Sequence, residues 1–458
     1  MTISFSKCII PTVILLVSIL LCCHSIDNLE DCTCEEKTQC QRVPDGVHLK
    51  HEGKEVYVMS DDHNEPRKTW KDWNWSLISS VISVDEPDPT LMCYTHLKGR
   101  RYGYTGKLHE ESLQEENEIK LWIQKEKNKV AKYFTDIYLL DMLQLTSSDL
   151  TAENVTVITG VISELKSNLV SISSDISLLC LINWFPPCRE YQCQFITKML
   201  SVCDKFMLNA ESFLNNEETH CLAQAAVPIT KLHLGFDEYM VSGVSPQKFI
   251  LSVPWHGYIY DCDIFKPKGN GSLYDQCFMR KKNGSQTCDY EHCRQKINMN
   301  KMAENYMKYE RDNTWNTVYL APYFNIKVTS GKFKQIWFED YRSLNHKYAY
   351  IRTMNVSGVA LWSGNDLQHS SSSWYEGYNK VMWGWLAHQA LMQPKKDNSF
   401  EDLKKLPQTM AGIGIGCVLI GGILGFIFGW GVFRRTHKRN RRQPFDKDMV
   451  YMEEDQNL

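Results

Sequence analysis

Short apolar runs alternate with amphipathic stretches along residues 77–363. The runs are bounded by turn residues and rich in β-branched residues, which is typical of buried strands. The stretches at 110–132 and 152–170 have helical periodicity. Alternating strands and helices predict an α/β fold with a parallel sheet covered on both faces, either doubly wound or closed into a barrel. The predicted strands lie at residues 77–84, 176–184, 205–209, 248–255 and 358–363.

Two further apolar runs lie outside this alternation. The first follows Lys7 and ends near the small residue Ser25, as in a cleaved secretory signal peptide; an uncleaved anchor is the alternative. The second, at 409–433, contains no charged residue and is long enough to cross a bilayer. A buried core helix is the alternative there, but the basic residues from Arg434 to Arg442 favour a transmembrane helix with a cytosolic C-terminus.

These segments predict a single-pass type I membrane protein, at the cell surface or in an endolysosomal membrane, with an extracellular or luminal ectodomain. Glycines spaced four apart, as in Gly421-xxx-Gly425, are consistent with a homodimer through the membrane helix and equally with an ordinary membrane segment. The predicted regions are a signal peptide at 1–25, one large domain at 26–392, a stalk at 393–408, the transmembrane helix at 409–433 and a cytoplasmic tail at 434–458.

Thirteen of the 17 cysteines lie in the large domain, in a compartment that permits disulfides. Clusters such as Cys32, Cys34 and Cys40, or Cys188 and Cys193, indicate disulfides rather than zinc, because no paired histidines accompany them. The odd number predicts at least one thiol that is free or paired between chains. The N-glycosylation sequons are at Asn74, Asn154, Asn270, Asn283 and Asn355.

Charge excludes one class of partner. Without the tail and Lys7, the chain has 43 basic and 49 acidic side chains, a net charge of −6. That balance argues against a nucleic-acid ligand. No pattern indicates a metal or an organic cofactor.

Six segments of the large domain form an ordered set of motifs. They are CTC at 32–34, KTWKDWNWS at 68–76, LMCYTHLKG at 91–99, VPWHGY at 253–258, APYFN at 321–325 and GVALW at 358–362. In order and rough spacing, over about residues 31–390, this set resembles the chitobiase-like branch of glycoside hydrolase family 18, the chitinase family. The resemblance implies that residues 26–392 form a (β/α)8 TIM barrel with a sugar-binding cleft at the C-terminal ends of the strands.

The family motif D-x-x-D-x-D-x-E lies on the fourth strand. Its glutamate protonates the leaving glycosidic oxygen, and the preceding aspartate orients the substrate's own attacking acetamido group. The matching run begins at Asp136 and has Leu139 at the second aspartate position. It keeps the orienting residue as Asp141 but has Leu143 in place of the acid. A shift of one residue puts Met142 there instead, so both registers predict a barrel without its general acid.

A second motif of the family is also altered. The resemblance places a tyrosine and an aspartate where this chain has Asn209 and Ala210, so the hydroxyl that holds the acetamido group is absent. Among possible substitute acids, Asp149 and Glu153 lie beyond the predicted end of the fourth strand. Glu211, near the sixth strand, is the remaining candidate.

Aromatic residues remain as candidate sugar contacts. The resemblance places Trp362 where the family stacks a sugar ring on an indole. Trp255 and Asp141 are further candidates for contact with carbohydrate. The alternative is that each is a core residue, with Asp141 a partnered carboxylate whose pKa is raised by its apolar neighbours.

The sequence therefore predicts a membrane-anchored, catalytically inactive relative of the chitinases. Its ligand would be a glycan containing N-acetylglucosamine or a protein partner. One alternative is an active membrane-bound glycosidase that degrades chitin oligosaccharides or N-glycan core fragments. Another is an adhesion or receptor protein that uses the barrel as a scaffold.

Overall fold

The computed structural model describes most of the chain between Cys32 and Leu391. The predicted signal peptide, stalk, transmembrane helix and cytoplasmic tail lie outside the described residues. Within the described part, none of the helices is both long and apolar enough to cross a membrane. The described residues are 32–44, 54–61, 69–109, 113, 115–145, 151–185, 194–211, 221–241, 243–269, 272–283, 288–299, 301–302, 314–328, 331–367 and 373–391.

Eight parallel strands close into a barrel, which decides between the two parallel-sheet folds that the hydrophobic pattern allowed. The strands follow chain order around the barrel, and the last pairs with the first, with Glu55 opposite Gly358. At that closure a Cβ on Gly358 would lie 2.5 Å from the Glu55 carbonyl oxygen, so only glycine fits. The barrel strands are β1 (Glu55–Ser60), β2 (Ser80–Ser83), β3 (Arg101–Lys107), β4 (Ile137–Asp141), β5 (Ser177–Asn183), β6 (Lys205–Asn209), β7 (Phe249–Pro254) and β15 (Gly358–Trp362).

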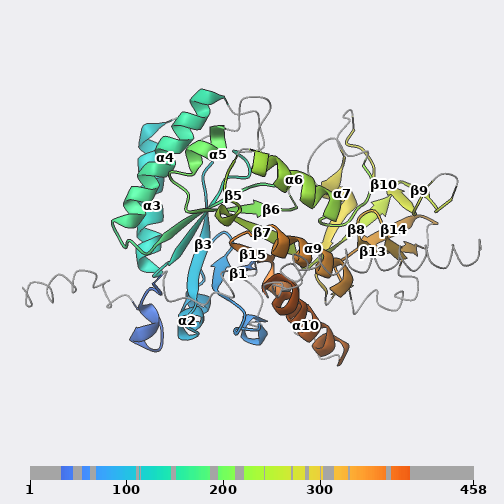
Figure 1. The fold of residues 1–458 in the computed structure, drawn as a ribbon, viewed down its shortest axis with the longest axis horizontal. Coiled ribbons are helices and arrows are strands. Elements are labelled where there is room, and N and C mark those ends of the chain that lie inside the picture. The colour runs from blue at the N-terminus through green and yellow to red at the C-terminus, as the bar shows by residue number, and fades with distance from the viewer. Residues whose placement is uncertain are drawn as a thin grey trace, which may run out of the picture. The chain divides into compact units, whose positions relative to one another are not determined.

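Helices cover the outside of the barrel, with α3, α4 and α5 together on one side of it in Figure 1. Local sequence sets several of their ends. The Asp88 carboxylate accepts hydrogen bonds from the first turn of α2, and Asp340 and Ser343 form a capping box at the start of α9. These helices are α2 (Pro89–Leu97), α3 (Glu116–Lys132), α4 (Ala152–Val170), α5 (Gln194–Met199), α6 (Ile229–Val241), α9 (Tyr341–Thr353) and α10 (Ser373–Trp385).

Between β7 and β15 the chain forms a second, antiparallel sheet of five strands, which the sequence did not predict. In Figure 1 it lies beside the barrel near α9. Its core includes Trp337, stacked on Tyr323 with ring centroids 4.7 Å apart. The sheet order is β11 (Arg294–Ile297), β8 (Gly257–Cys262), β14 (Phe333–Trp337), β13 (Ala321–Lys327) and β12 (Thr314–Asn316); β9 (Ile264–Lys266) and β10 (Gln276–Phe278) form a separate hairpin.

Disulfides account for most of the described cysteines, as expected for an oxidising compartment. Cys32, Cys34 and Cys40, which lie close enough to suggest a metal site, are all engaged in disulfides. Cys293 is free and buried, and the predicted pair of Cys188 and Cys193 lies outside the described residues. The disulfides are Cys32–Cys40, Cys34–Cys93, Cys180–Cys203, Cys221–Cys288 and Cys262–Cys277.

Candidate functional site

The mouth of the barrel is defined by the side chains that point inward at the C-terminal ends of its strands. Successive side chains of a strand point to opposite faces, so every second residue enters the barrel. A small apolar cluster, here called the interior cluster, fills the inside of the barrel below the mouth. Its members are Tyr57, Met59, Ile82, Ile137, Leu139, Leu179, Leu181, Met207, Ile250 and Ala360.

Strand β4 shows which of its residues face the mouth. Ile137 and Leu139 belong to the interior cluster, and the half-buried Leu143 packs against that cluster. Met142 is fully buried in the other core, between barrel and helices. The inward series therefore continues to Leu143 and not to Met142.

Asp141 lies in this inward series at the end of β4. Its carboxylate accepts a hydrogen bond from the Leu143 backbone N–H at 2.9 Å. Burial raises the pKa of the Asp141 carboxyl above its ordinary value, although that hydrogen bond and the positive charge of Lys107 act in the opposite direction. The direction is the one expected for an acid with apolar neighbours.

Asp136, the first residue of the matching run, is buried on the opposite side of the strand. Its carboxylate accepts hydrogen bonds from the backbone N–H groups of Tyr102 at 2.7 Å and Val43 at 2.8 Å. It also lies 2.9 Å from Nε2 of His96. These contacts fix neighbouring segments to β4 and lie away from the mouth, so Asp136 has a structural role.

The end of β6 supplies Asn209 and Ala210. Asn209 is half-buried and follows the inward residue Met207 by two positions. Its side-chain oxygen accepts a hydrogen bond from the Glu211 backbone N–H at 3.0 Å. Ala210 is buried in the outer core, and its N–H donates to the Ser252 hydroxyl at 3.0 Å.

The two candidate tryptophans occupy different environments. Trp362 is half-buried at the end of β15 and packs against the interior cluster. Trp255 is completely buried, and its indole N–H donates to the Tyr348 hydroxyl at 2.7 Å. It packs edge-to-face against Trp383, with ring centroids 4.9 Å apart. Trp255 is therefore a core residue in this structure and does not reach a ligand.

A dense network of ionisable groups lies at the mouth on the side of β6, β7 and β15. Nε2 of the fully buried His256 is 2.6 Å from a Glu211 carboxylate oxygen, and Nδ1 is 2.9 Å from Asp366. The Tyr258 hydroxyl donates to the same oxygen of Glu211 at 2.9 Å. Glu211 follows β6, His256 follows β7, and Asp366 lies in the short helix η8 (Gly364–Leu367) after β15.

The network continues into the five-stranded sheet through Lys296 on β11. Its Nζ lies 3.0 Å from Asp61 and 3.4 Å from Asp366. Asp61, which directly follows β1, also accepts a hydrogen bond from the Ser363 hydroxyl at 2.6 Å. The network thus joins the ends of β1, β6, β7 and β15 to the neighbouring sheet.

Mutual pairing sets the protonation of the network. Burial opposes charge on His256, but the carboxylates of Glu211 and Asp366 raise its pKa to about 9. Burial likewise favours the neutral form of Glu211, yet the attraction of His256 and Lys296 and the hydrogen bonds to His256 and Tyr258 lower its pKa below the ordinary value. Glu211 is therefore ionised and His256 protonated at neutral pH. Sequence reasoning named Glu211 but missed its partners.

Four of the five sequon asparagines lie on the surface. Asn74, Asn154, Asn283 and Asn355 are exposed, as attachment of a glycan requires. Asn270 lies outside the described residues.

Two curated proteins are similar to this chain in sequence. No protein-family model matches the chain. Mouse di-N-acetylchitobiase is 25% identical over 365 residues, which covers 78% of this chain and 93% of the mouse protein. Human di-N-acetylchitobiase is 23% identical over 372 residues, covering 79% and 90%.

Solved structures agree on the fold. The glycoside hydrolase family 18 chitinase of Cycas revoluta, in complex with (GlcNAc)4, is 12% identical with a TM-score of 0.54, covering 72% of this chain and 99% of that one. A chitinase from Rhizomucor miehei is 15% identical with a TM-score of 0.53, covering 72% and 100%.

The closed parallel barrel, with inward residues gathered at the C-terminal ends of its strands, defines the fold as a (β/α)8 barrel. Within that class, the ordered similarity to the chitobiases extends over most of the chain. The chain is thus similar to the di-N-acetylchitobiases over most of its length, with a fold like that of the glycoside hydrolase family 18 chitinase of Cycas revoluta.

Proposed function

We propose that this protein is a membrane-anchored pseudo-glycosidase whose barrel mouth binds glycans containing N-acetylglucosamine without hydrolysing them. The observation that carries the proposal is the inward position of Leu143, two residues beyond Asp141. General acid catalysis in a glycosidase requires a carboxylic acid within reach of the leaving oxygen and contributes about 10²- to 10⁴-fold in rate. A leucine side chain cannot donate a proton.

The inward series along β4 favours Leu143 over Met142 as the counterpart of the family acid. Met142 packs in the outer core, where no substrate reaches. Asp141 then has the place of the orienting aspartate, and its carboxylate is bound to the Leu143 N–H.

The altered end of β6 supports the same proposal. A tyrosine hydroxyl is absent at Asn209, whose side-chain oxygen is bound to the Glu211 backbone. The aspartate of the family motif is replaced by Ala210, which is buried away from the mouth. Two separate parts of the reaction centre would thus be missing from one site.

Glu211 is the strongest candidate for a substitute acid, and its contacts argue against that role. The His256 ring and the Tyr258 hydroxyl both donate toward one Glu211 oxygen. They stabilise the carboxylate and lower its pKa, so Glu211 holds no proton to donate at neutral pH. An active glycosidase with a displaced acid is therefore the weaker alternative.

Sugar binding needs apolar surface and polar edges rather than a proton donor. Trp362 supplies an aromatic surface at the mouth, and Asp141 and Asn209 supply polar edges. Among the similar chitinase structures, one was solved with NAG4 and another with (GlcNAc)4. These complexes support N-acetylglucosamine oligosaccharides as the ligand class.

Anchoring of the barrel rests on the sequence. The basic cluster after residues 409–433 supports a type I orientation at the cell surface or in an endolysosomal membrane, and the glycine spacing supports self-association. The test is protease treatment of sealed membranes from expressing cells. Protease should remove only the cytosolic C-terminal tail, a loss of a few kilodaltons, and leave the glycosylated remainder protected inside the vesicles, whereas release of the whole chain by carbonate washing contradicts the anchor.

The decisive functional experiment measures turnover and binding on the same purified full-length chain. A fluorogenic chitobioside reports hydrolysis, with mouse di-N-acetylchitobiase as the positive control, and calorimetry reports binding of chitotriose. Saturable binding without turnover supports the proposal. Turnover that is lost on Glu211→Gln supports the active enzyme instead. If the chain shows no turnover and no glycan binding but adheres to a partner cell, the scaffold alternative is supported.

A further inference from the structure

A cavity of about 490 Å³ opens on the five-stranded sheet, next to the network at the barrel mouth. It lies against β8, β11 and the short helix α7 (Tyr290–Cys293). Its volume falls in the range of small-molecule sites. Lining it are Tyr258, Lys282, Cys288, Tyr290, Glu291, Arg294 and Lys296.

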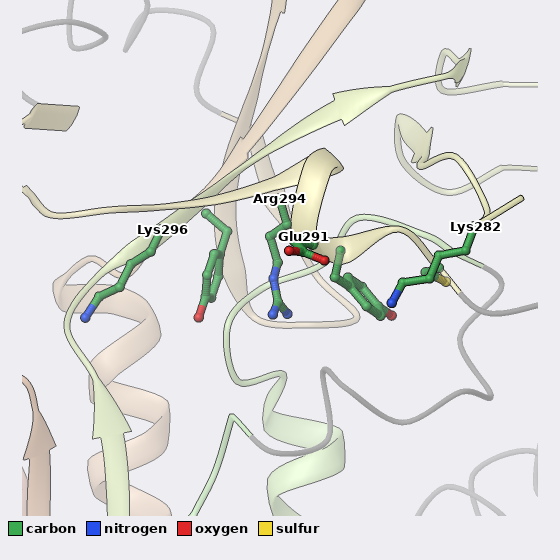
Figure 2. A pocket seen from close by; sticks show the side chains of 7 residues that line it. Lys282, Glu291, Arg294 and Lys296 are labelled. Atoms are coloured by element: carbon green, nitrogen blue, oxygen red, sulfur yellow. The ribbon is translucent and has the colours of Figure 1, made fainter. Parts of the chain in front are cut away.

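Three cationic side chains share the wall of this cavity. Figure 2 shows the charged ends of Lys282, Arg294 and Lys296 on the same side of the chain, in a row. Glu291 is the one carboxylate among the lining residues. Lys296 is partly neutralised by Asp61 and Asp366, at 3.0 and 3.4 Å. The exposed Lys282 forms no ion pair within the described part of the chain, so the cavity keeps an excess of positive charge.

Aromatic rings hold Arg294 in place. Its guanidinium carbon lies 4.9 Å from the centre of the Tyr258 ring and 4.8 Å from that of Tyr290. A guanidinium fixed between two rings loses little rotational freedom when it binds a planar anion. Such a group binds carboxylate and sulfate oxygens in pairs.

The cavity adjoins the network at the barrel mouth, because two residues belong to both. Tyr258 lines the cavity and donates to Glu211 at the end of β6. Lys296 lines it and reaches Asp61 after β1 and Asp366 after β15. The cavity and the network at the mouth therefore lie next to each other.

We propose that this cavity binds the carboxylate or sulfate group of an acidic saccharide whose N-acetylglucosamine unit lies at the barrel mouth. This rests on the proposed function only in assigning the neutral part of the ligand to the mouth. The aromatic wall suits a sugar ring, and the cations select the acidic substituent. A neutral chitin fragment would leave these cations without a partner in the ligand.

The test compares saccharides on the purified full-length chain by calorimetry. The probes are chitotriose, a tetrasaccharide of alternating glucuronate and N-acetylglucosamine, sulfated chitotriose, and glucuronic acid alone. At least one acidic oligosaccharide is expected to bind roughly tenfold more tightly than chitotriose, because hydrogen bonds to charged groups are stronger. Added salt should weaken the binding of the acidic ligand and leave the binding of chitotriose unchanged.

Two variants with the same charge change locate the effect. Lys282→Glu, in the cavity, should lose about tenfold in affinity for the acidic ligand and leave chitotriose unchanged. Lys332→Glu is the matched control, because Lys332 is exposed and does not line the cavity. Both variants are also measured in combination with Asn283→Gln, because this substitution removes the glycosylation sequon beside Lys282.

The outcomes separate this inference from the function on which it rests. Binding of chitotriose with no preference for either acidic ligand, or equal losses in the two variants, overturns the cavity assignment alone. Binding of glucuronic acid that Lys282→Glu abolishes, without any binding of chitotriose, overturns the proposed function and the joint ligand together. A preference for acidic oligosaccharides that the wild type and Lys332→Glu show and Lys282→Glu loses supports the inference.

Discussion

The β4 side of the barrel mouth and the side formed by β6, β7 and β15 use ionisable residues in opposite ways. On the β4 side, Leu139 and Leu143 extend the apolar interior up to the mouth, around the carboxylate of Asp141. On the other side, Glu211 and His256 belong to a network in which each charge contacts an opposite one.

This difference distinguishes a site that would donate a proton from a network that stabilises the fold. An acid that must give up a proton needs a raised pKa and access to substrate. The network does the reverse, because its pairing lowers the pKa of Glu211 and raises that of His256 to about 9. The charges of the network stabilise the fold, whereas on the β4 side the inward residue that follows Asp141 is Leu143.

The largest effect is expected from breaking the buried network at its centre. His256→Ala would leave Glu211 and Asp366 facing each other without the cation between them. Removing one member of a buried ion pair costs about 3–5 kcal/mol in free energy of unfolding. Urea unfolding measures the loss.

His109→Ala is the control for that experiment, because His109 is exposed. It should change the free energy of unfolding by less than about 0.5 kcal/mol. Equal effects of the two variants would contradict the structural role of the network.

The second prediction concerns pH and sharpens the first. The folded pKa of His256 is raised from 6.5 to about 9, so its stabilisation is complete below pH 6.5 and is lost as pH rises through 9. The loss is on the order of 3 kcal/mol. Urea unfolding from pH 6 to 10 should show this slope in the wild type and a flatter one in His256→Gln. Parallel curves would contradict the assignment.

A third variant tests the mouth as a sugar site. Trp362→Ala removes the half-buried indole at the end of β15, and chitotriose affinity should fall about tenfold. Trp255→Phe is the control, because Trp255 is buried and its loss should lower stability without changing affinity. Calorimetry measures both affinities, and an unchanged affinity in Trp362→Ala would place the ligand elsewhere.

The smallest effect is expected on the β4 side. Burial raises the pKa of Asp141, so its charged form opposes folding. Asp141→Asn should therefore change the free energy of unfolding by no more than about 1 kcal/mol at pH 7. Any gain in the free energy of unfolding should shrink as pH falls. The raised pKa means that the Asp141 carboxyl of the wild type becomes neutral at a higher pH in the folded state than in the unfolded state. A large destabilisation at every pH would show that its ionised form supports the fold.

Periodicity predicted the elements that carry long apolar patterns. The stretch at 152–170 is α4, and the run at 205–209 is β6. Strand β3 was missed because its sequence, RYGYTGK, contains no apolar run. It is buried because Gly103 and Gly106 let β4 approach closely: a Cβ on Gly103 would lie 2.4 Å from the Ile137 carbonyl oxygen.

The network was missed for a different reason. Its members are separated by tens to hundreds of residues, and only the closed barrel brings them together. No local spacing relates Lys296 to Asp61. By contrast, the leucine at the expected position of the acid could be read from the sequence, because a strand motif is local and each position has one expected residue.

Hydrolysis of a fluorogenic chitobioside by the purified full-length chain tests the central claim most directly. With Leu143 at the inward position, release of fluorophore should equal that of a heat-denatured sample, at a protein concentration at which mouse di-N-acetylchitobiase gives a strong signal. Steady turnover by the folded chain that disappears on Asp141→Asn or Glu211→Gln would contradict the account.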